Sequence, residues 1–256
     1  IIKKASYDPE AVALFNRMTT KPDSVRKRLI SDFFIGLKND LGISTLSSVF
    51  DAIYFQAAHA QQAATLNWVQ NNYNLIEVNS PAWVADRGYT SNGTTSYLNT
   101  SFVPSTANGN YVQNSAHVAV YSRTPGQLDL MEIGATSAGG NTQLRCRTTS
   151  DQTGHSLNDG AVGVANNTSG SGLFHLNRSA SANYLVYRNG SSLGTIANVS
   201  TGLPTVSFFI CCRNVADSPS LLSTRQISFS SIGESVSQTF LNNRVTTFLT
   251  AIGANV

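Results

Sequence analysis

The residues of this chain that come nearest to catalytic chemistry lie in the segment Gln127-Leu128-Asp129-Leu130-Met131-Glu132. If this segment is a strand, it carries two carboxylates, those of Asp129 and Glu132. Two carboxylates can hydrolyse a glycosidic bond when one attacks the sugar and the other moves the proton. The position that would supply the attacking carboxylate is Gln127, and an amide cannot form the covalent sugar intermediate. We therefore predict that the segment is inactive and that the chain is not an enzyme.

Two other predicted strands, residues 115–123 and 142–148, place polar side chains on one face. Strand alternation turns Val118, Val120 and Leu144 toward the core and turns their polar neighbours the other way. The candidate ligand-binding residues on these polar faces are His117, Tyr121, Arg123, Arg145 and Arg147. Such side chains suit sugar hydroxyls or an acidic glycan. A solvated or subunit-contacting face is the open alternative.

Other chemistries lack their usual residue patterns. The four histidines have no paired metal-ligand spacing, and no G-x-S-x-G sequence marks a serine nucleophile. The three cysteines, Cys146, Cys211 and Cys212, are odd in number and also lack metal spacing. We expect buried free thiols, with an inter-subunit disulfide as the alternative, and no metal or cofactor.

The composition is that of a chain of short strands and many turns. Apolar residues make up 41% and charged residues only 12%, about half the usual charged share. The basic cluster Lys21, Arg26, Lys27 and Arg28 has no interleaved aromatic residues, so we expect a solvated helix face and no nucleic-acid partner. No apolar run approaches the about 18 residues of a membrane span, so membrane insertion is not expected. A start at Ile1 without methionine suggests a fragment or a processed product.

Residues 1–65 are predicted to form a helical segment for docking or assembly. Asp8-Pro9-Glu10 is a helix start, with Asp as N-cap and Pro at the first helical position. A second amphipathic helix follows Pro22 and ends near Gly42. A third helix is predicted from Thr45 to about Ala58, because apolar residues recur there at helical spacing.

Residues 66–256 are predicted to form an antiparallel β-sandwich closed by a helix at 235–252. Short period-two segments alternate with turn sequences along this part of the chain. Ser235 and Gln238 are spaced as a capping box for the final helix. The predicted core residues are Val118, Val120, Leu144, Phe174, Leu185 and Phe209.

Several short segments resemble laminin-G and concanavalin A-like domains. Residues 93–100 resemble their opening strand, and Tyr184-Leu185-Val186-Tyr187-Arg188-Asn189-Gly190 resembles their Asn-Gly hairpin. The resemblance implies a mainly β, concanavalin A-like jelly roll with three short N-terminal helices and a C-terminal helix. Hydrolases of the laminarinase class share this sandwich and use a Glu-x-Asp-x-x-Glu strand. Gln127, Asp129 and Glu132 would form a degenerate version of it, although chance agreement in an ordinary strand is the interpretation we favour.

A second resemblance covers nearly the whole chain. Four segments resemble a module of tailed-phage and prophage tail or fibre proteins. They are Arg17-Met18-Thr19-Thr20-Lys21-Pro22, Leu66-Asn67-Trp68, Arg87-Gly88-Tyr89 and Asn114-Ser115-Ala116-His117. This resemblance implies a structural protein of the virion, located in the extracellular particle, with other virion proteins as partners. It also implies possible contact with host surface glycan, and by analogy with fibres we expect a homo-oligomer, first of all a trimer. A carbohydrate-binding lectin-like module is the alternative, and a polysaccharide-degrading glycosidase is the less favoured third.

Overall fold

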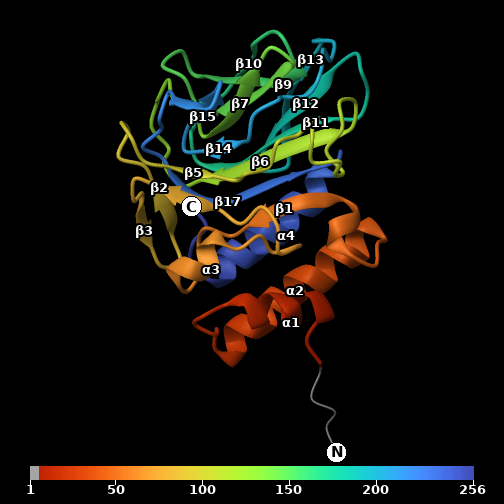
Figure 1. Cartoon of the computed structure of the whole chain (residues 1–256), viewed down its shortest axis with the longest axis vertical. Coiled ribbons are helices and arrows are strands. Elements are labelled where there is room, and N and C mark those ends of the chain that lie inside the picture. Colours follow the sequence, from red (N-terminus) through yellow and green to blue (C-terminus); the bar gives the residue numbers. More distant parts are fainter. Residues whose placement is uncertain (1–5) are drawn as a thin grey trace, which may run out of the picture.

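Two β-sheets packed face to face form the body of the chain, and helices cover one outer side (Figure 1). The computed structural model describes residues 6–256. Within this range there are four α-helices and one 3-10 helix, and the sheets contain eight and nine strands. The prediction of a mainly β sandwich with added helices is therefore confirmed at this level.

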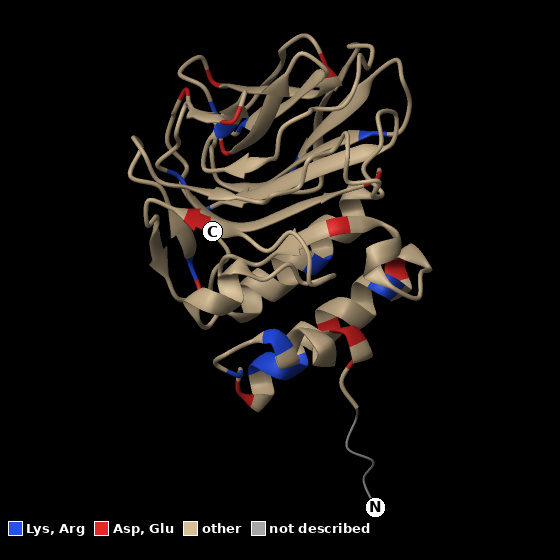
Figure 2. Cartoon of the chain, in the orientation of Figure 1, with Lys and Arg blue, Asp and Glu red and all other residues tan. Residues whose placement is uncertain are grey.

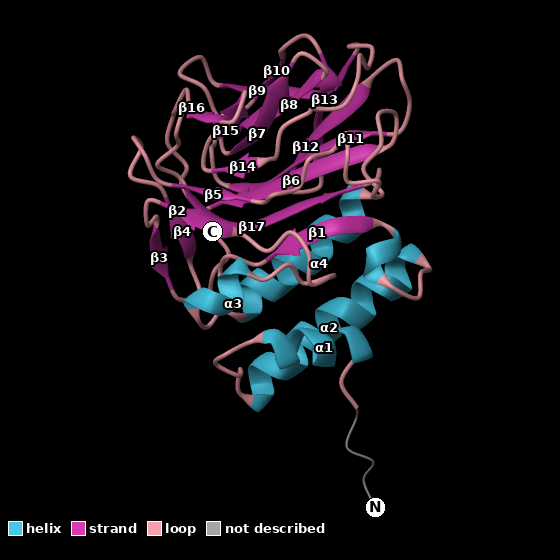
Figure 3. Cartoon of the chain, viewed as in Figure 1, coloured by secondary structure: helices cyan, strands magenta, loops and turns pink. Residues whose placement is uncertain are grey.

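The first sheet is the middle layer, between the second sheet and the helices (Figure 3). Its strand order is β13-β12-β11-β6-β17-β4-β3, and β1 pairs with β17 beside β4. The bounds are β13 Ser191–Ile196, β12 Tyr184–Arg188, β11 Gly172–Arg178, β6 Ala116–Ser122, β17 Gln226–Gly233, β4 Gly88–Thr90, β3 Ala82–Val84 and β1 Phe50–Tyr54. Every residue of β6 and β11 is buried, because these strands are covered on both faces.

The second sheet has only one of its faces against the first. Its order is β10-β9-β8-β7-β14-β5-β2, with β15 added beside β7 and β16 beside β15. The bounds are β10 Gly163–Asn166, β9 Gln152–Asp159, β8 Gly140–Arg145, β7 Ile133–Ser137, β14 Phe209–Ile210, β5 Tyr97–Asn99, β2 Ile76–Val78, β15 Arg213–Val215 and β16 Ser218–Ser220. All named strand pairs are antiparallel except β15 with β7, which is parallel.

The first two helices begin and end where the sequence predicts. Helix α1 (Pro9–Arg17) starts at the N-cap Asp8, whose side chain accepts a hydrogen bond from the backbone N–H of Glu10. Helix α2 (Ser24–Leu41) ends at Gly42, which adopts the left-handed conformation with φ 68°. None of the helices within residues 6–256 combines the length and apolar character needed to cross a membrane.

The predicted third helix, residues 45–58, is wrong. This segment contains a single 3-10 turn, Leu46–Ser48, followed by strand β1. All residues from 51 to 58 are buried, so the apolar spacing that resembled one helix stripe belongs to a strand covered on both faces. Strand β1 pairs with β17 from the far end of the chain. The chain therefore enters the sandwich before residue 65, and helix α3 (Gln61–Thr65) follows the strand.

The C-terminal helix α4 (Gln238–Ala251) packs against α2 and β11. Its N-cap is Ser237 and makes no side-chain cap hydrogen bond, so the predicted capping box of Ser235 and Gln238 is not formed. The backbone N–H of Ser235 donates instead to Ser115 Oγ, and tertiary contacts set the entry to the helix.

An aromatic cluster joins the helices to the sheet. Helix α2 contributes Phe33 and Phe34, and helix α4 contributes Phe248. Phe55 and Trp68 complete the cluster, and their ring centroids lie 4.3 Å apart. The apolar stripe of α2 is thus buried within the chain. The docking or assembly role of residues 1–65 stays a prediction.

Five of the six predicted core residues are buried, and Leu185 is the exception. Leu185 is half-exposed because its neighbours Tyr184 and Val186 occupy the buried face of β12. Phe209 is only 3% exposed but lies on the outer side of the second sheet, opposite Gly134, with its ring tilted against that of Tyr97 at a centroid distance of 4.4 Å.

Candidate ligand-binding face

The predicted ligand face does not exist as one surface. His117, Tyr121 and Arg123 lie on or directly after β6 in the first sheet, whereas Arg145 and Arg147 lie on or after β8 in the second. The two sheets face each other, and their outer sides point in opposite directions (Figure 1). Strand alternation correctly separated polar from core positions within each strand, but it could not tell that the two strands belong to different sheets.

His117 is a buried structural residue. Its exposed fraction is 0%, and its ring lies against Phe50 at a centroid distance of 5.3 Å. Nδ1 lies 2.5 Å from the carbonyl oxygen of Glu234, and Nε2 lies 3.0 Å from Ser231 Oγ. Burial lowers the pKa of His117 to about 4. The assignment of His117 to a ligand surface is therefore wrong.

Tyr121 and Arg123 are covered by the last residues of the chain. The Tyr121 hydroxyl donates to Val256 O at 3.0 Å, and the Arg123 Nε donates to Ala254 O at 2.8 Å. Tyr121 is 1% exposed, and the Arg123 Nη1 is bound to Gln226 Oε1 at 2.7 Å. The C-terminal segment occupies the positions that a ligand would take, so this half of the predicted face is also wrong.

Arg145 remains on an outward surface, and a second arginine that the sequence did not single out joins it. Arg145 lies on the outer side of β8, opposite Gly154 of β9, and its side chain is 26% exposed. Arg213, at the start of β15, donates from Nη1 to Gln143 Oε1 at 3.0 Å. We call Gln143, Arg145 and Arg213 the arginine face.

The arginine face has little side-chain bulk beneath it. A Cβ at Gly134 would lie 2.8 Å from the Arg213 Cβ and 3.1 Å from the Gln143 Cβ, so glycine lets these side chains meet above β7. Burial and the neighbouring Arg145 lower the pKa of Arg213, which remains a cation in all practical conditions. The Nε atoms of Arg145 and Arg213 are buried and have no hydrogen-bond partner among residues 6–256, so only the terminal nitrogens of these side chains can face outward.

Negative charge around the arginine face is weak. The nearest carboxylate to Arg145 is Asp129, at 3.8 Å from Nη1 and with a side chain that is 46% exposed. At that distance and exposure the pair contributes little. The partly exposed Arg145 guanidinium, with Arg213 beside it, can therefore donate hydrogen bonds to an anionic group from outside the chain.

Arg147 has a structural role beside this face. Its Nε and Nη2 both contact Asp151 Oδ1, at 2.8 and 2.7 Å, and its Nη1 donates to Pro125 O at 3.0 Å. Gln127 donates to the same Asp151 oxygen at 2.8 Å. Arg147 thus ties the loop after β6 to the loop after β8, and each of its three side-chain nitrogens already has a partner.

The segment that resembled a hydrolase strand is mostly loop. Strand β7 starts only at Ile133. Asp129 is exposed and its carboxylate accepts a hydrogen bond from Thr149. Glu132, in contrast, is 0% exposed. Its carboxylate is held by Arg225 Nε at 3.1 Å, Ser223 Oγ at 2.7 Å and the Cys146 N–H at 2.6 Å. Burial raises the pKa of Glu132. The two carboxylates do not share an open surface, so these residues do not form a facing pair.

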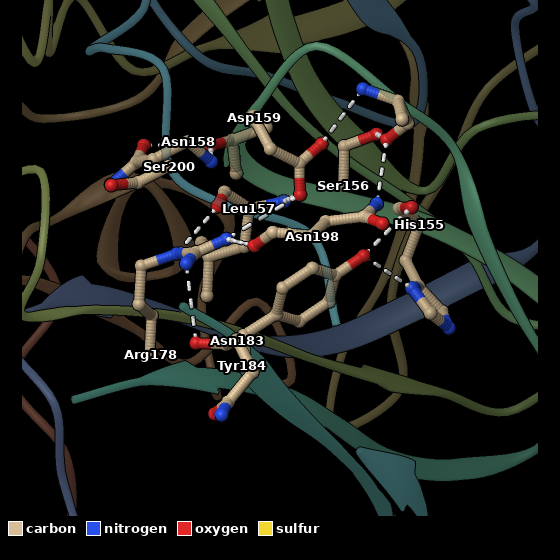
Figure 4. A network of polar contacts seen from close by, with 12 residues as sticks. His155, Ser156, Leu157, Asn158, Asp159, Arg178, Asn183, Tyr184, Asn198 and Ser200 are labelled. Carbon is tan, nitrogen blue, oxygen red and sulfur yellow. Dashed lines mark hydrogen bonds and ion pairs between the residues drawn. The ribbon is translucent and has the colours of Figure 1, made fainter. Parts of the chain in front are cut away.

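A larger polar network in the interior was not foreseen from the sequence (Figure 4). Arg178 is 0% exposed and donates to the carbonyl oxygens of Leu157 at 2.8 Å, Ser181 at 2.9 Å and Asn198 at 3.0 Å. Its Nη2 lies 3.5 Å from Asp159 Oδ2. The guanidinium joins three chain segments and has no side open to a ligand, so we regard it as structural.

Charged residues gather on the N-terminal helices, and the sandwich carries few (Figure 2). Within the basic cluster, Lys21 donates to Phe15 O at 2.6 Å and to Met18 O at 2.8 Å, at the end of α1. Arg26 pairs with Asp86 at 2.7 Å. These two cations therefore hold helices in place.

All three cysteines are free and buried, as predicted. Burial raises the pKa of the Cys211 thiol to about 12. Among residues 6–256 no group of three or more His, Cys, Asp or Glu side chains is arranged to hold a metal ion.

Comparison with known proteins identifies the fold and no family. No protein-family model matches the sequence, and no curated protein matches it. Among solved structures, a mutant Trypanosoma rangeli sialidase with trans-sialidase activity superposes with a TM-score of 0.56 at 14% identity, covering 91% of this chain and 39% of the sialidase. Domain 4 of an extracellular arabinanase from Geobacillus stearothermophilus, in complex with arabinotriose, gives 0.52 at 14% identity, covering 76% and 99%.

The binding domain of botulinum neurotoxin serotype D gives a TM-score of 0.51 at 10% identity, covering 77% of this chain and 51% of that one. The chain therefore spans about half or less of the sialidase and toxin structures that it resembles. At these identities the similarity shows a shared β-sandwich fold.

Proposed function

We propose that this chain is a non-enzymatic, glycan-binding structural component of a phage virion, built on a concanavalin A-like sandwich. The observation that carries the binding half is the arginine face, where the Arg145 side chain is 26% exposed and has only a 3.8 Å contact with Asp129. An arginine donates paired hydrogen bonds to carboxylate or phosphate. The ligand class that follows is an acidic glycan of a host envelope.

The fold supports this proposal. Sandwiches of similar shape occur in a sialidase and in an arabinanase domain that holds arabinotriose. A neutral-sugar lectin is the alternative, and it predicts binding that does not depend on the arginines. A glycosidase is a weaker third candidate, because Glu132 is enclosed and Gln127 cannot act as a nucleophile.

The virion half of the proposal rests on the resemblance of Arg17-Met18-Thr19-Thr20-Lys21-Pro22 and its companion segments to phage tail and fibre modules. It implies assembly with other virion proteins, with a homotrimer as the first expectation. Mass spectrometry of purified particles and sedimentation of the isolated chain test it. A strictly monomeric chain that is absent from particles would refute this half.

The binding half is tested on an array of carboxylated, phosphorylated and neutral glycans. We expect retention of acidic glycans, weakened about tenfold or more by Arg145→Ala or Arg213→Ala, because each removes a charge-assisted hydrogen bond. Arg87→Ala removes the same charge from the first sheet, where Arg87 Nη1 bonds only to the adjacent Asp86 carbonyl, and is the matched control. Equal binding by all three variants would exclude the arginine face.

A further inference from the structure

A polar cavity lies away from the arginine face, over strand β1. Its volume is about 330 Å³, and it lies between β1, the loop around residue 72 and the loop at 107–110. Its lining includes Ser47, Asp51, Asn72, Tyr73, Asn108 and Gly109, and we call it the Asp51 pocket. The volume lies at the lower end of the range of about 300–1,000 Å³ for small-molecule sites.

The Asp51 carboxylate is fixed in position at the base of this pocket. Oδ1 accepts the backbone N–H of Asn110 at 2.9 Å, and Oδ2 accepts that of Tyr111 at 2.8 Å. The side-chain amide of Asn110 also lies 3.5 Å from Oδ1, so Oδ2 keeps the freer capacity to accept a further hydrogen bond. Asp51 is 3% exposed, and burial raises its pKa, so its charged form is poorly solvated.

The loop that closes the pocket is held by the interior network. The Tyr111 hydroxyl donates to Asn158 Oδ1 at 2.6 Å and lies 2.7 Å from Thr142 Oγ1. Asn158 is the residue next to Asp159 in the network of Figure 4. The pocket therefore keeps its shape without a ligand, which reduces the ordering cost of binding.

The rim of the pocket offers unused hydrogen-bonding groups. Asn72 and Asn108 are exposed, and their side-chain amides make no hydrogen bond to any of residues 6–256. Gly109 packs directly against the carboxylate, because a Cβ there would overlap Asp51 Oδ1. Amides that can donate and accept thus surround a buried acceptor.

We propose that the Asp51 pocket binds a neutral pyranose or a similar polyol, with sugar hydroxyls donating to Asp51 and bonding to the amides of Asn72 and Asn108. An anionic sugar is disfavoured because its carboxylate would meet that of Asp51. The almost wholly polar lining disfavours an apolar ligand. This site would add a neutral-sugar contact to the acidic-group contact of the proposed function, but it does not depend on it.

The test is a titration of the whole chain with D-galactose, D-glucose and N-acetylglucosamine, followed through backbone amide NMR signals. We expect at least one sugar to shift the Asn110 and Tyr111 signals saturably, with a dissociation constant in about the millimolar range. Asn72→Ala and Asn108→Ala should each weaken that binding about fivefold, as loss of one hydrogen bond does. Gly109→Ala should abolish it.

The matched control is Asn166→Ala, an exposed asparagine of β10 in the second sheet, which should bind like the unmodified chain. If none of the three sugars shifts these amides, or if both rim variants bind normally, the proposal is wrong. A shift produced by calcium chloride but not by sugar would equally overturn it in favour of a cation site. Arg145→Ala should leave this titration unchanged, so failure here is distinct from failure of the arginine face.

Discussion

The buried His117 should make the stability of this protein depend on pH in a way that one substitution removes. Its neutral ring is bonded to Glu234 O and Ser231 Oγ inside a fully buried site. Folding lowers the pKa of His117 from 6.5 to about 4. The unfolded chain therefore binds a proton more readily than the folded chain, and acid favours unfolding.

The size of the effect follows from this shift. One pKa unit corresponds to about 1.4 kcal/mol, so the lowering corresponds to about 3 kcal/mol of unfolding free energy. This contribution is fully present above the unfolded pKa of about 6.5 and is lost as the pH falls through the folded value of about 4. His117→Asn keeps a side-chain N–H near Glu234 O and removes the titration.

The assay is urea unfolding of both proteins between about pH 7.5 and pH 4. As the pH falls, the unmodified chain should lose about 3 kcal/mol more of its free energy of unfolding than His117→Asn loses. Phe50→Leu, which alters packing against the same ring, should change stability equally at each pH. A difference for His117→Asn that stays constant within about 0.5 kcal/mol would refute the reasoning.

Three further results are expected. Phe209→Ala should lower the free energy of unfolding by about 3 kcal/mol in urea titrations, because a nearly buried ring and its contact with Tyr97 are lost. A cost below about 1 kcal/mol would contradict this burial. Arg178→Ala should lower the free energy of unfolding by about 3–5 kcal/mol in the same assay, because Asp159 would remain buried without its cation. An unchanged urea midpoint would show that the network is dispensable. The unmodified chain should release no reducing sugar from β-glucans or bacterial capsular polysaccharide. If the unmodified chain does release reducing sugar and Glu132→Gln abolishes that activity, the non-enzymatic proposal is wrong.

The sequence alone determined where an element begins or ends when residues next to that point decide it. Asp8 and Pro9 start the first helix because a side-chain acceptor and a fixed φ are both local properties. Gly42 ends the second for the same kind of reason. Strand β6 lies within the predicted strand 115–123, since the apolar alternation that marks it lies within a few residues.

Tertiary contacts alone decided which polar side chains meet solvent. Tyr121 and Arg123 alternate with core residues as a solvent-facing pair would, yet residues about 130 positions later in the chain cover them. Residues 50–54 have helical apolar spacing but become a strand, because β17 supplies the hydrogen bonds and both faces are buried.

The two candidate sites depend on contacts between segments that are far apart in the sequence. Arg145 and Arg213 are neighbours only because β15 lies beside β7 and β7 pairs with β8. The Asp51 pocket needs a loop some 60 residues away to cross β1 and bond to its carboxylate. A periodic pattern reports the face of one element, whereas a binding site is made where elements meet, and only the packing of the whole chain fixes where that is.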